Sequence, residues 1–131
     1  MTLLLDTHIL IWLALSGQPD ARTAPDAVKN LVNDPDNRLF FSAASIWELA
    51  IKLGKREGFA HNPARLREGL LTNRYEELAI TGAHVLAAGP LPPIHADPFD
   101  RIMIAQAMVE NMLFVTADRQ IARYDAPIRL V

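Results

Sequence analysis

Short apolar segments recur along the whole chain, and segments with helical spacing lie between them. An apolar run of about four residues suits a buried β-strand and is too short for a helix. Strands that alternate with helices are typical of an α/β fold, in which a parallel sheet carries helices on both faces. The five predicted strands are residues 2–5, 38–41, 77–80, 113–116 and 128–131.

The helices between these strands are predicted from apolar spacing and from residues that favour helix ends. Pro25 suits a first helical turn, and Asn62, Thr81 and Asp97 suit the N-cap position that precedes one. We therefore expect helices at residues 7–16, 25–32, 42–56, 62–72, 81–89 and 97–111, and a further short helix after residue 116.

Composition limits the class of protein. A length of 131 residues, half of them hydrophobic, suits one domain, to which we assign residues 1–131. No apolar run reaches the roughly 18–20 residues that a membrane-spanning helix needs. Cysteine is absent, which excludes disulfides and zinc–thiolate sites. The same absence is compatible with a reducing cytoplasm, where we expect the protein to act.

Charge is unevenly distributed, although the net charge is only −2. Residues 52–74 contain six basic and two acidic residues, whereas the rest of the chain contains seven basic and thirteen acidic ones. A basic region beside an acidic remainder can attract a polyanion while the acidic groups hold cations. A solvated helical face is the other interpretation of the same pattern.

Four acidic residues stand where a parallel sheet brings ligand-binding groups together. Asp6 directly follows the first predicted strand, and Asp118 lies two residues past the fourth. Ligands bind at the carboxyl ends of strands in such sheets, so these two acids share one edge. Asp100 and Glu48, both on predicted helices, can reach that edge. Simpler interpretations remain open: helix capping for the first two, a favourable first-turn position for Asp100, and pairing with Lys52 for Glu48.

A cation would relieve the repulsion within such a cluster, since neighbouring carboxylates raise one another's pKa. Mg²⁺ and Mn²⁺ prefer oxygen ligands, and Mg²⁺ keeps several waters, so a few carboxylates suffice. The metal can activate a water for attack on phosphorus and stabilise charge on the phosphoryl oxygens. This chemistry requires no histidine, serine or lysine nucleophile.

Four stretches carry a resemblance to a known family. They are LLLDTHILIW at 3–12, SAASIWELAIKLGK at 42–55, HADPFDRIMIAQA at 95–107 and LFVTADRQIARY at 113–124. In these stretches the chain resembles a PIN-domain protein, specifically a VapC-type toxin ribonuclease of a type II toxin–antitoxin system. The stretches follow the family's order and touch nearly the whole chain, while residues 57–94 match in general character.

The resemblance implies a three-layer α/β/α sandwich around a mainly parallel sheet, and an endoribonuclease that depends on Mg²⁺ or Mn²⁺. Carried over by position, Asp6, Glu48 and Asp100 are metal ligands. Asp118 is the fourth acid, which binds a second metal or acts through water. The resemblance also implies products with a 5′-phosphate and a 3′-hydroxyl, a homodimer, and a cognate antitoxin protein that covers the active site.

Several residues are expected to support this site. By resemblance, Thr116 orients it and Asp97 belongs to it, most simply as the N-cap that places Asp100. Ser45 can assist through a hydrogen bond. Arg101 can neutralise the acids, contact phosphate or form a salt bridge.

An RNA backbone is expected to be guided by three basic residues, Lys52, Lys55 and Arg56. This expectation rests on charge segregation alone. Arg65 and Arg67 would extend this surface. His95 is expected to fix the proline-rich loop before it, with metal ligation as the weaker alternative. Trp47 is expected in the core rather than stacked on a base.

Other classes fit less well. A receiver-like signalling domain needs a lysine late in the chain, and no lysine follows Lys55. A haloacid-dehalogenase-type phosphatase needs an aspartate two residues after Asp6, where His8 stands. A catalytically quiet PIN fold that binds RNA or protein as a scaffold remains open. The sequence does not specify the RNA target or the cleavage sequence.

Overall fold

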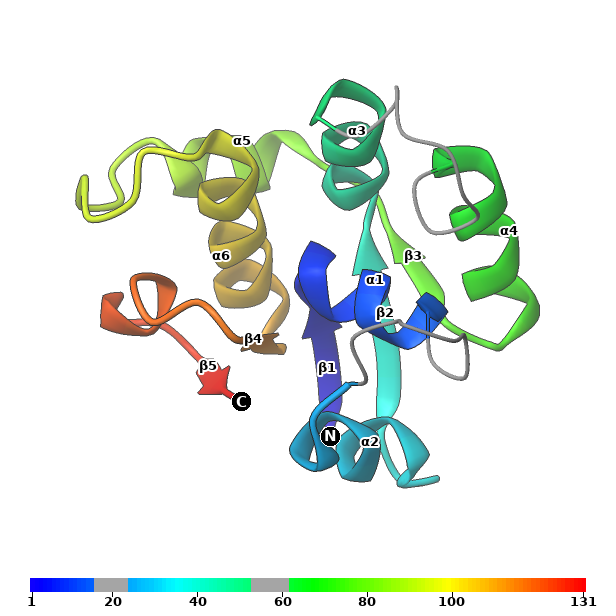
Figure 1. Ribbon diagram of the computed structural model, residues 1–131. Helices are drawn as coiled ribbons and strands as arrows, with labels where there is room; N and C mark the ends of the chain where they lie inside the picture. Colours follow the sequence, from blue (N-terminus) through cyan, green and yellow to red (C-terminus); the bar gives the residue numbers. More distant parts are fainter. Residues whose placement is uncertain (16–23, 53–61) are drawn as a thin grey trace.

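The computed structural model describes residues 1–15, 24–52 and 62–131. At its centre lies a five-stranded sheet in which all neighbouring strands run parallel, in the order β3-β2-β1-β4-β5 (Figure 1). The strands are β1 (Thr2–Leu5), β2 (Arg38–Ser42), β3 (Glu76–Leu78), β4 (Leu113–Thr116) and β5 (Ile128–Leu130). All five predicted strands are confirmed, although β3 ends two residues before its predicted end.

Helices connect the strands as predicted, with ends that differ by a residue or two. They are α1 (Thr7–Leu15), α2 (Asp26–Asn33), α3 (Ala43–Lys52), α4 (Pro63–Thr72), α5 (Gly82–Ala88) and α6 (Pro98–Glu110). The predicted short helix after β4 is a single 3₁₀ turn, η2 (Ile121–Arg123). The remainder of the predicted helix 42–56, beyond Lys52, lies outside the described residues.

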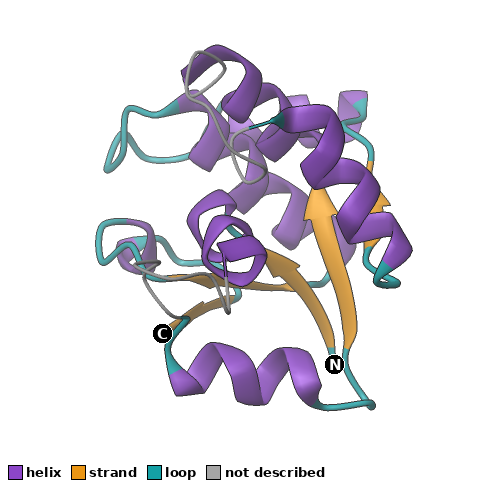
Figure 2. Cartoon of the chain, turned by 45° about the vertical axis from the view of Figure 1, so that its right-hand side comes forward, coloured by secondary structure: helices purple, strands orange, loops and turns teal. Residues whose placement is uncertain are grey.

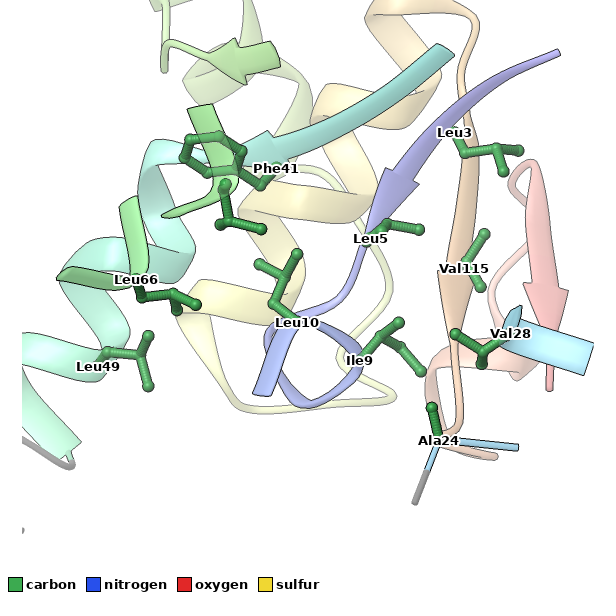
Figure 3. Close-up of a cluster of buried hydrophobic side chains, with 11 residues drawn as sticks. Leu3, Leu5, Ile9, Leu10, Ala24, Val28, Phe41, Leu49, Leu66 and Val115 are labelled. Atoms are coloured by element: carbon green, nitrogen blue, oxygen red, sulfur yellow. The ribbon is translucent and has the colours of Figure 1, made fainter. Parts of the chain in front are cut away.

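Alternation along β1 sends side chains to opposite faces of the sheet. Leu3 and Leu5 point into one core, where they pack with residues of α1 to α4 and of β2 and β4. Figure 3 shows these side chains pointing toward one another. The buried members of this core are Leu3, Leu5, Ile9, Leu10, Ala24, Val28, Phe41, Leu49, Leu66, Leu70 and Val115.

The intervening Leu4 points into a second core on the other face, which α6 covers together with η2. Leu4 lies opposite Phe40 of β2 and Phe114 of β4 in the sheet, and Met103 and Ile104 of α6 pack against the same cluster. Helices therefore lie on both faces of the sheet (Figure 2). The predicted three-layer α/β/α architecture is confirmed.

Capping residues place several helix starts as predicted. The Asn62 side chain accepts from Arg65 N at 3.1 Å, and Thr81 forms a capping box with His84.

The expectation that Trp47 lies in the core is wrong. Its side chain is 58% exposed and meets the ring of Phe99 edge-on, with 5.0 Å between the ring centroids. On α3 the core-facing positions are taken by Ala44 and Leu49 instead. None of the helices in the described ranges is both long and apolar enough to cross a membrane.

Candidate metal centre

Acidic side chains from two helices and from the residues after two strands lie at the carboxyl ends of β1 and β4. Asp6 follows β1 directly, Asp118 follows β4, and Glu48 and Asp100 come from α3 and α6. Two groups of possible ligands lie there, each with one ligand atom per residue and all atoms within 4.8 Å of one another. The groups are Glu48, Asp97 and Asp100, and His95, Asp100 and Asp118. Asp100 belongs to both groups, so they form one continuous cluster.

Asp6 is held by neutral hydrogen-bond donors. Its Oδ1 accepts from Thr7 N at 2.7 Å, and its Oδ2 accepts from Thr116 Oγ1 at 2.7 Å. Thr116 Oγ1 in turn accepts from Asp118 N at 3.0 Å. Leu5 lies opposite Val115 in the parallel register, which brings the residues after both strands side by side. Thr116, expected to orient the site, thus links the carboxylate of Asp6 to the backbone of Asp118.

Thr7 extends this network to Glu48 and was missed at the sequence level. Its Oγ1 donates to Glu48 Oε1 at 2.6 Å and lies 2.8 Å from Ser45 Oγ. Since the Thr7 hydroxyl has one hydrogen, Ser45 donates to Thr7. Ser45 therefore acts on the site through Thr7 rather than directly. The available signal was the position of Thr7, immediately after Asp6 in the LLLDTHILIW segment.

Lys52 lies on the acidic cluster. Its Nζ is 2.9 Å from Glu48 Oε2 and 2.5 Å from Asp97 Oδ2. The i,i+4 pair with Glu48, one of the simpler interpretations of the sequence, is therefore present. Of the three residues expected to guide RNA, Lys52 is the one the structure describes, since Lys55 and Arg56 lie outside the described residues. Arg67, expected to extend this surface, pairs with Glu77 at 2.6 Å.

Asp97 is the N-cap of α6, as expected. Its Oδ1 accepts from Phe99 N at 2.9 Å and from Asp100 N at 3.4 Å. Burial acts to raise the pKa of Asp97, but the hydrogen bonds and charge of Lys52, with the backbone N–H groups, lower the pKa below its ordinary value. Asp97 is therefore an ionised member of the cluster as well as a cap.

Asp100 behaves in the opposite way. Its pKa is raised to about 8, mainly by burial. The nearby charges of Asp6, Asp97 and Glu48 raise it further, with Asp6 contributing most of the three. Burial also raises the pKa of Asp6, against the hydrogen bonds from Thr116 and Thr7. Ionising both carboxylates near neutral pH is therefore costly without a further positive charge.

The donor set fits a divalent cation that prefers oxygen. Carboxylate oxygens from Glu48, Asp97 and Asp100 lie within reach of one ion, and Asp118 adjoins them through Asp100. Asp6 is close enough for its charge to act on Asp100. The raised pKa values of Asp6 and Asp100 show that nearby positive charge does not compensate their ionised forms. A bound cation would supply that charge.

His95 lies closer to the acids than the sequence suggested. Its Nε2 is 3.1 Å from Asp118 Oδ2 and 3.1 Å from Asp100 Oδ2. The expectation that its ring fixes the proline-rich loop is wrong, because the ring points at the carboxylates. The signal was its place in the HADPFDR segment, two residues before the N-cap of α6.

Arg101 fixes this loop. The expectation that it neutralises the acidic cluster is therefore wrong. Its guanidinium donates to the carbonyl oxygens of Pro92 and Leu91 at 2.9 Å each, and to that of Ala88 at 3.2 Å. The planar fork of arginine suits several carbonyl acceptors at once. Its side chain points from α6 toward the loop, while Asp100 beside it points toward the sheet edge.

Comparison with known proteins identifies the family and supports the fold. A family model described as PIN domain matches residues 3–127. A chain of VapBC2 from Rickettsia felis, in a structure bound to a promoter DNA fragment, is similar with a TM-score of 0.75 at 19% identity; the match covers 100% of this chain and 99% of that one. VapBC-1 from nontypeable Haemophilus influenzae gives 0.66 at 20% identity, covering 99% and 98%. A toxin–antitoxin complex from Klebsiella pneumoniae gives 0.64 at 19% identity, covering 96% and 94%. No curated protein sequence matches the chain.

Proposed function

The chain belongs to the PIN domain family, and from this premise we propose that it is a metal-dependent endoribonuclease that uses Mg²⁺, with Mn²⁺ able to replace it. The observation that carries the proposal is the shared position of Asp100, whose carboxylate belongs to both groups of ligand atoms. A buried carboxylate with a pKa of about 8, surrounded by four other acids, is suited to holding a divalent cation.

In this proposal Asp6, Glu48 and Asp100 hold the cation, and Asp118 completes the acidic pocket. When bound, the cation supplies a Lewis acid that activates water and stabilises charge on the phosphoryl oxygens. The Thr7 and Thr116 hydroxyls keep the carboxylates of Glu48 and Asp6 in fixed orientations. Such prior orientation lowers the cost of assembling the site around a substrate phosphate.

The substrate side of the proposal rests on charge. Lys52, whose side chain is partly exposed, places an ammonium at the rim of the cluster. We expect Lys55 and Arg56 to continue this surface along the RNA backbone. Replacing both with Ala should weaken RNA binding and reduce its dependence on salt concentration, because fewer counterions are released. An unchanged salt slope would remove them from the binding surface.

The partner proposal follows from the structural neighbours, one of which is a toxin–antitoxin complex from Klebsiella pneumoniae. We propose that this chain is the toxin of such a pair, that it acts in the cytoplasm, and that a cognate antitoxin inhibits it. We also propose a homodimer. Size-exclusion chromatography with light scattering tests the dimer, and a monomer at high concentration would contradict it.

The decisive experiment is RNA cleavage by the purified, antitoxin-free protein. Structured and unstructured RNAs are incubated with Mg²⁺, with Mn²⁺ and with EDTA, and an Asp6→Asn variant runs in parallel. Asp6→Asn keeps the shape of the side chain and removes its charge. We expect cleavage with either metal, and loss of cleavage both in EDTA and in the variant.

Asp125→Asn is a matched control, because Asp125 is exposed. This variant should cleave as the native protein does. A folded native protein that bound RNA and cut none of it would favour the scaffold function instead. Absence of cleavage, RNA binding and Mg²⁺ binding together would reject the nuclease proposal.

A further inference from the structure

We propose that His95 is a positioning residue, which donates a hydrogen bond from Nε2 to hold Asp118 beside Asp100 and stays outside the coordination shell of the cation. The distances alone suggest the opposite, since Nε2 lies within ligand range of both carboxylates. The hydrogen bonds around the ring decide between the two roles. The inference rests on the metal assignment proposed above.

The first observation is the partner of the other ring nitrogen. Asp97 N donates to His95 Nδ1 at 3.2 Å. A nitrogen that accepts a hydrogen bond presents its lone pair and carries no proton, so the neutral ring has its proton on Nε2. That proton faces Asp118 Oδ2 at 3.1 Å, with Asp100 Oδ2 at the same distance. His95 is thus a hydrogen-bond donor to the acidic cluster.

Metal ligation through Nε2 would require the other tautomer. The proton would then sit on Nδ1 and face the N–H of Asp97, which places two donors against each other. The Asp97 backbone has little freedom to turn away, because its side chain caps α6 and pairs with Lys52. The arrangement therefore opposes a ligand role for His95 and leaves the cation with oxygen ligands.

A second set of contacts fixes the backbone that carries the ring. His95 N donates to the hydroxyl of Tyr124 at 2.9 Å, and Tyr124 is buried. Arg101 reaches the same hydroxyl at 3.4 Å while it holds the carbonyls of the proline-rich loop. Arg101 therefore stabilises the position of His95 indirectly, through its hydrogen bonds to the loop and to Tyr124.

Asp118 is the acid that most needs such a donor. Its side chain is 38% exposed, compared with 12% for Asp100. Repulsion from Asp100 would turn an unrestrained carboxylate toward solvent. Gln120 N donates to Asp118 Oδ1 at 2.8 Å, and His95 fixes the other oxygen. A donor outside the coordination shell fixes Asp118 without occupying a ligand position on the cation.

Imidazole nitrogen NMR tests the donor role directly. Two-bond ¹H–¹⁵N correlation spectra distinguish a protonated ring nitrogen from one with a free lone pair, and His95→Gln identifies the signals of this ring. We expect Nε2 to be protonated in the metal-free protein and to remain so after Mg²⁺ is added. Loss of the Nε2 proton on adding Mg²⁺ would make His95 a ligand and overturn the proposal.

Calorimetric titration with Mg²⁺ tests the positioning role. His95→Ala should weaken Mg²⁺ binding by about 10-fold, whereas His95→Gln, which keeps an N–H donor, should retain most of the affinity. Equal, native-like affinity in both variants would contradict the proposal. Neither measurement uses RNA, so a protein that holds His95 as described and cuts no RNA would refute the proposed nuclease and leave this inference standing.

Discussion

The two flanks of the acidic cluster are built from different kinds of partner. On one flank, Asp6 is almost fully buried and accepts hydrogen bonds from a backbone N–H and the Thr116 hydroxyl. On the other flank, the ammonium of Lys52 pairs with both Asp97 and Glu48. Neutral donors act on the first flank, and a full positive charge acts on the second.

This difference shows where a cation is needed. Hydroxyl donors fix the direction of a carboxylate and leave its charge in place, and burial then keeps the pKa of Asp6 raised. Lys52 compensates the charge of Asp97, whose pKa is lowered. Ionisation is therefore least compensated at Asp6 and Asp100, and a bound cation would stabilise the charged forms of these two acids most.

Replacing Asp100 should have the largest effect, because it links both flanks. Asp100→Asn should reduce RNA cleavage at saturating Mg²⁺ by at least about 100-fold, since it removes a charge on which metal-assisted catalysis depends. The same variant should be more stable than the native protein without metal at pH near 8. Cleavage assays and urea denaturation in EDTA measure the two effects, and a variant that loses activity and stability together would contradict the assigned charge role.

Removing the Thr116 hydroxyl tests the neutral flank alone. Thr116→Val leaves Asp6 Oδ2 and Asp118 N without a buried partner, which should cost about 2 kcal/mol of unfolding free energy. Mg²⁺ binding should weaken as well, because Asp6 loses its fixed orientation. Thr116→Ser keeps the hydroxyl and serves as the control. If Val and Ser variants unfolded at the same urea concentration as the native protein, the hydroxyl would not hold this flank.

The fold and the acids were predictable from sequence because their signals are local. The strand β1 is an apolar run, Asp6 ends it, and Asn62 and Asp97 cap helices within four residues of the groups they bind. Each of these features depends on short spacing along the chain. The positions of Asp6 and Asp118 at one sheet edge then follow from parallel topology.

The partners of the acids were harder to predict because they join distant residues. Thr7 reaches Glu48 across 41 residues, and Arg101 and His95 meet at Tyr124. A charge beside an acid in sequence, as Arg101 is beside Asp100, need not share its direction on a helix, since adjacent residues do not face each other there. The prediction for Trp47 was wrong for a similar reason. Tryptophan is usually buried, but the position of Trp47 on α3 faces solvent.

Asp100 and Asp97 should also respond oppositely to pH. The pKa of Asp100 is raised to about 8, so the folded state binds this proton more tightly than the unfolded chain. Its contribution to stability is complete below the ordinary aspartate pKa and is lost as pH rises to about 8. The pKa of Asp97 is lowered, so its contribution is present above the ordinary value and lost as pH falls below it.

Urea denaturation in EDTA should therefore show stability falling by on the order of 3–4 kcal/mol between pH near 5 and pH near 8, since each pKa unit corresponds to about 1.4 kcal/mol. Excess Mg²⁺ should remove most of this decline, since the cation stabilises the ionised cluster. Asp100→Asn should flatten the profile without metal. A native profile that rose over this range in EDTA would contradict the pKa direction assigned to Asp100.

The smallest effect, and the most specific to the charged flank, is expected from Lys52→Gln. Lys52 competes with a cation for oxygens of Glu48 and Asp97, so its removal should tighten Mg²⁺ binding by a few-fold, on the scale of about 1 kcal/mol or less for a partly exposed pair. RNA binding should weaken at the same time, because one positive charge is removed from the rim of the cluster.

Arg38→Gln is the charge-matched control, since Arg38 begins β2 at the opposite end of the strands and pairs there with Glu76. Calorimetry with Mg²⁺ and RNA binding in EDTA separate the two effects. If Lys52→Gln weakened Mg²⁺ binding as Thr116→Val is expected to do, Lys52 would orient the ligands rather than compete for them, and the two flanks would act alike.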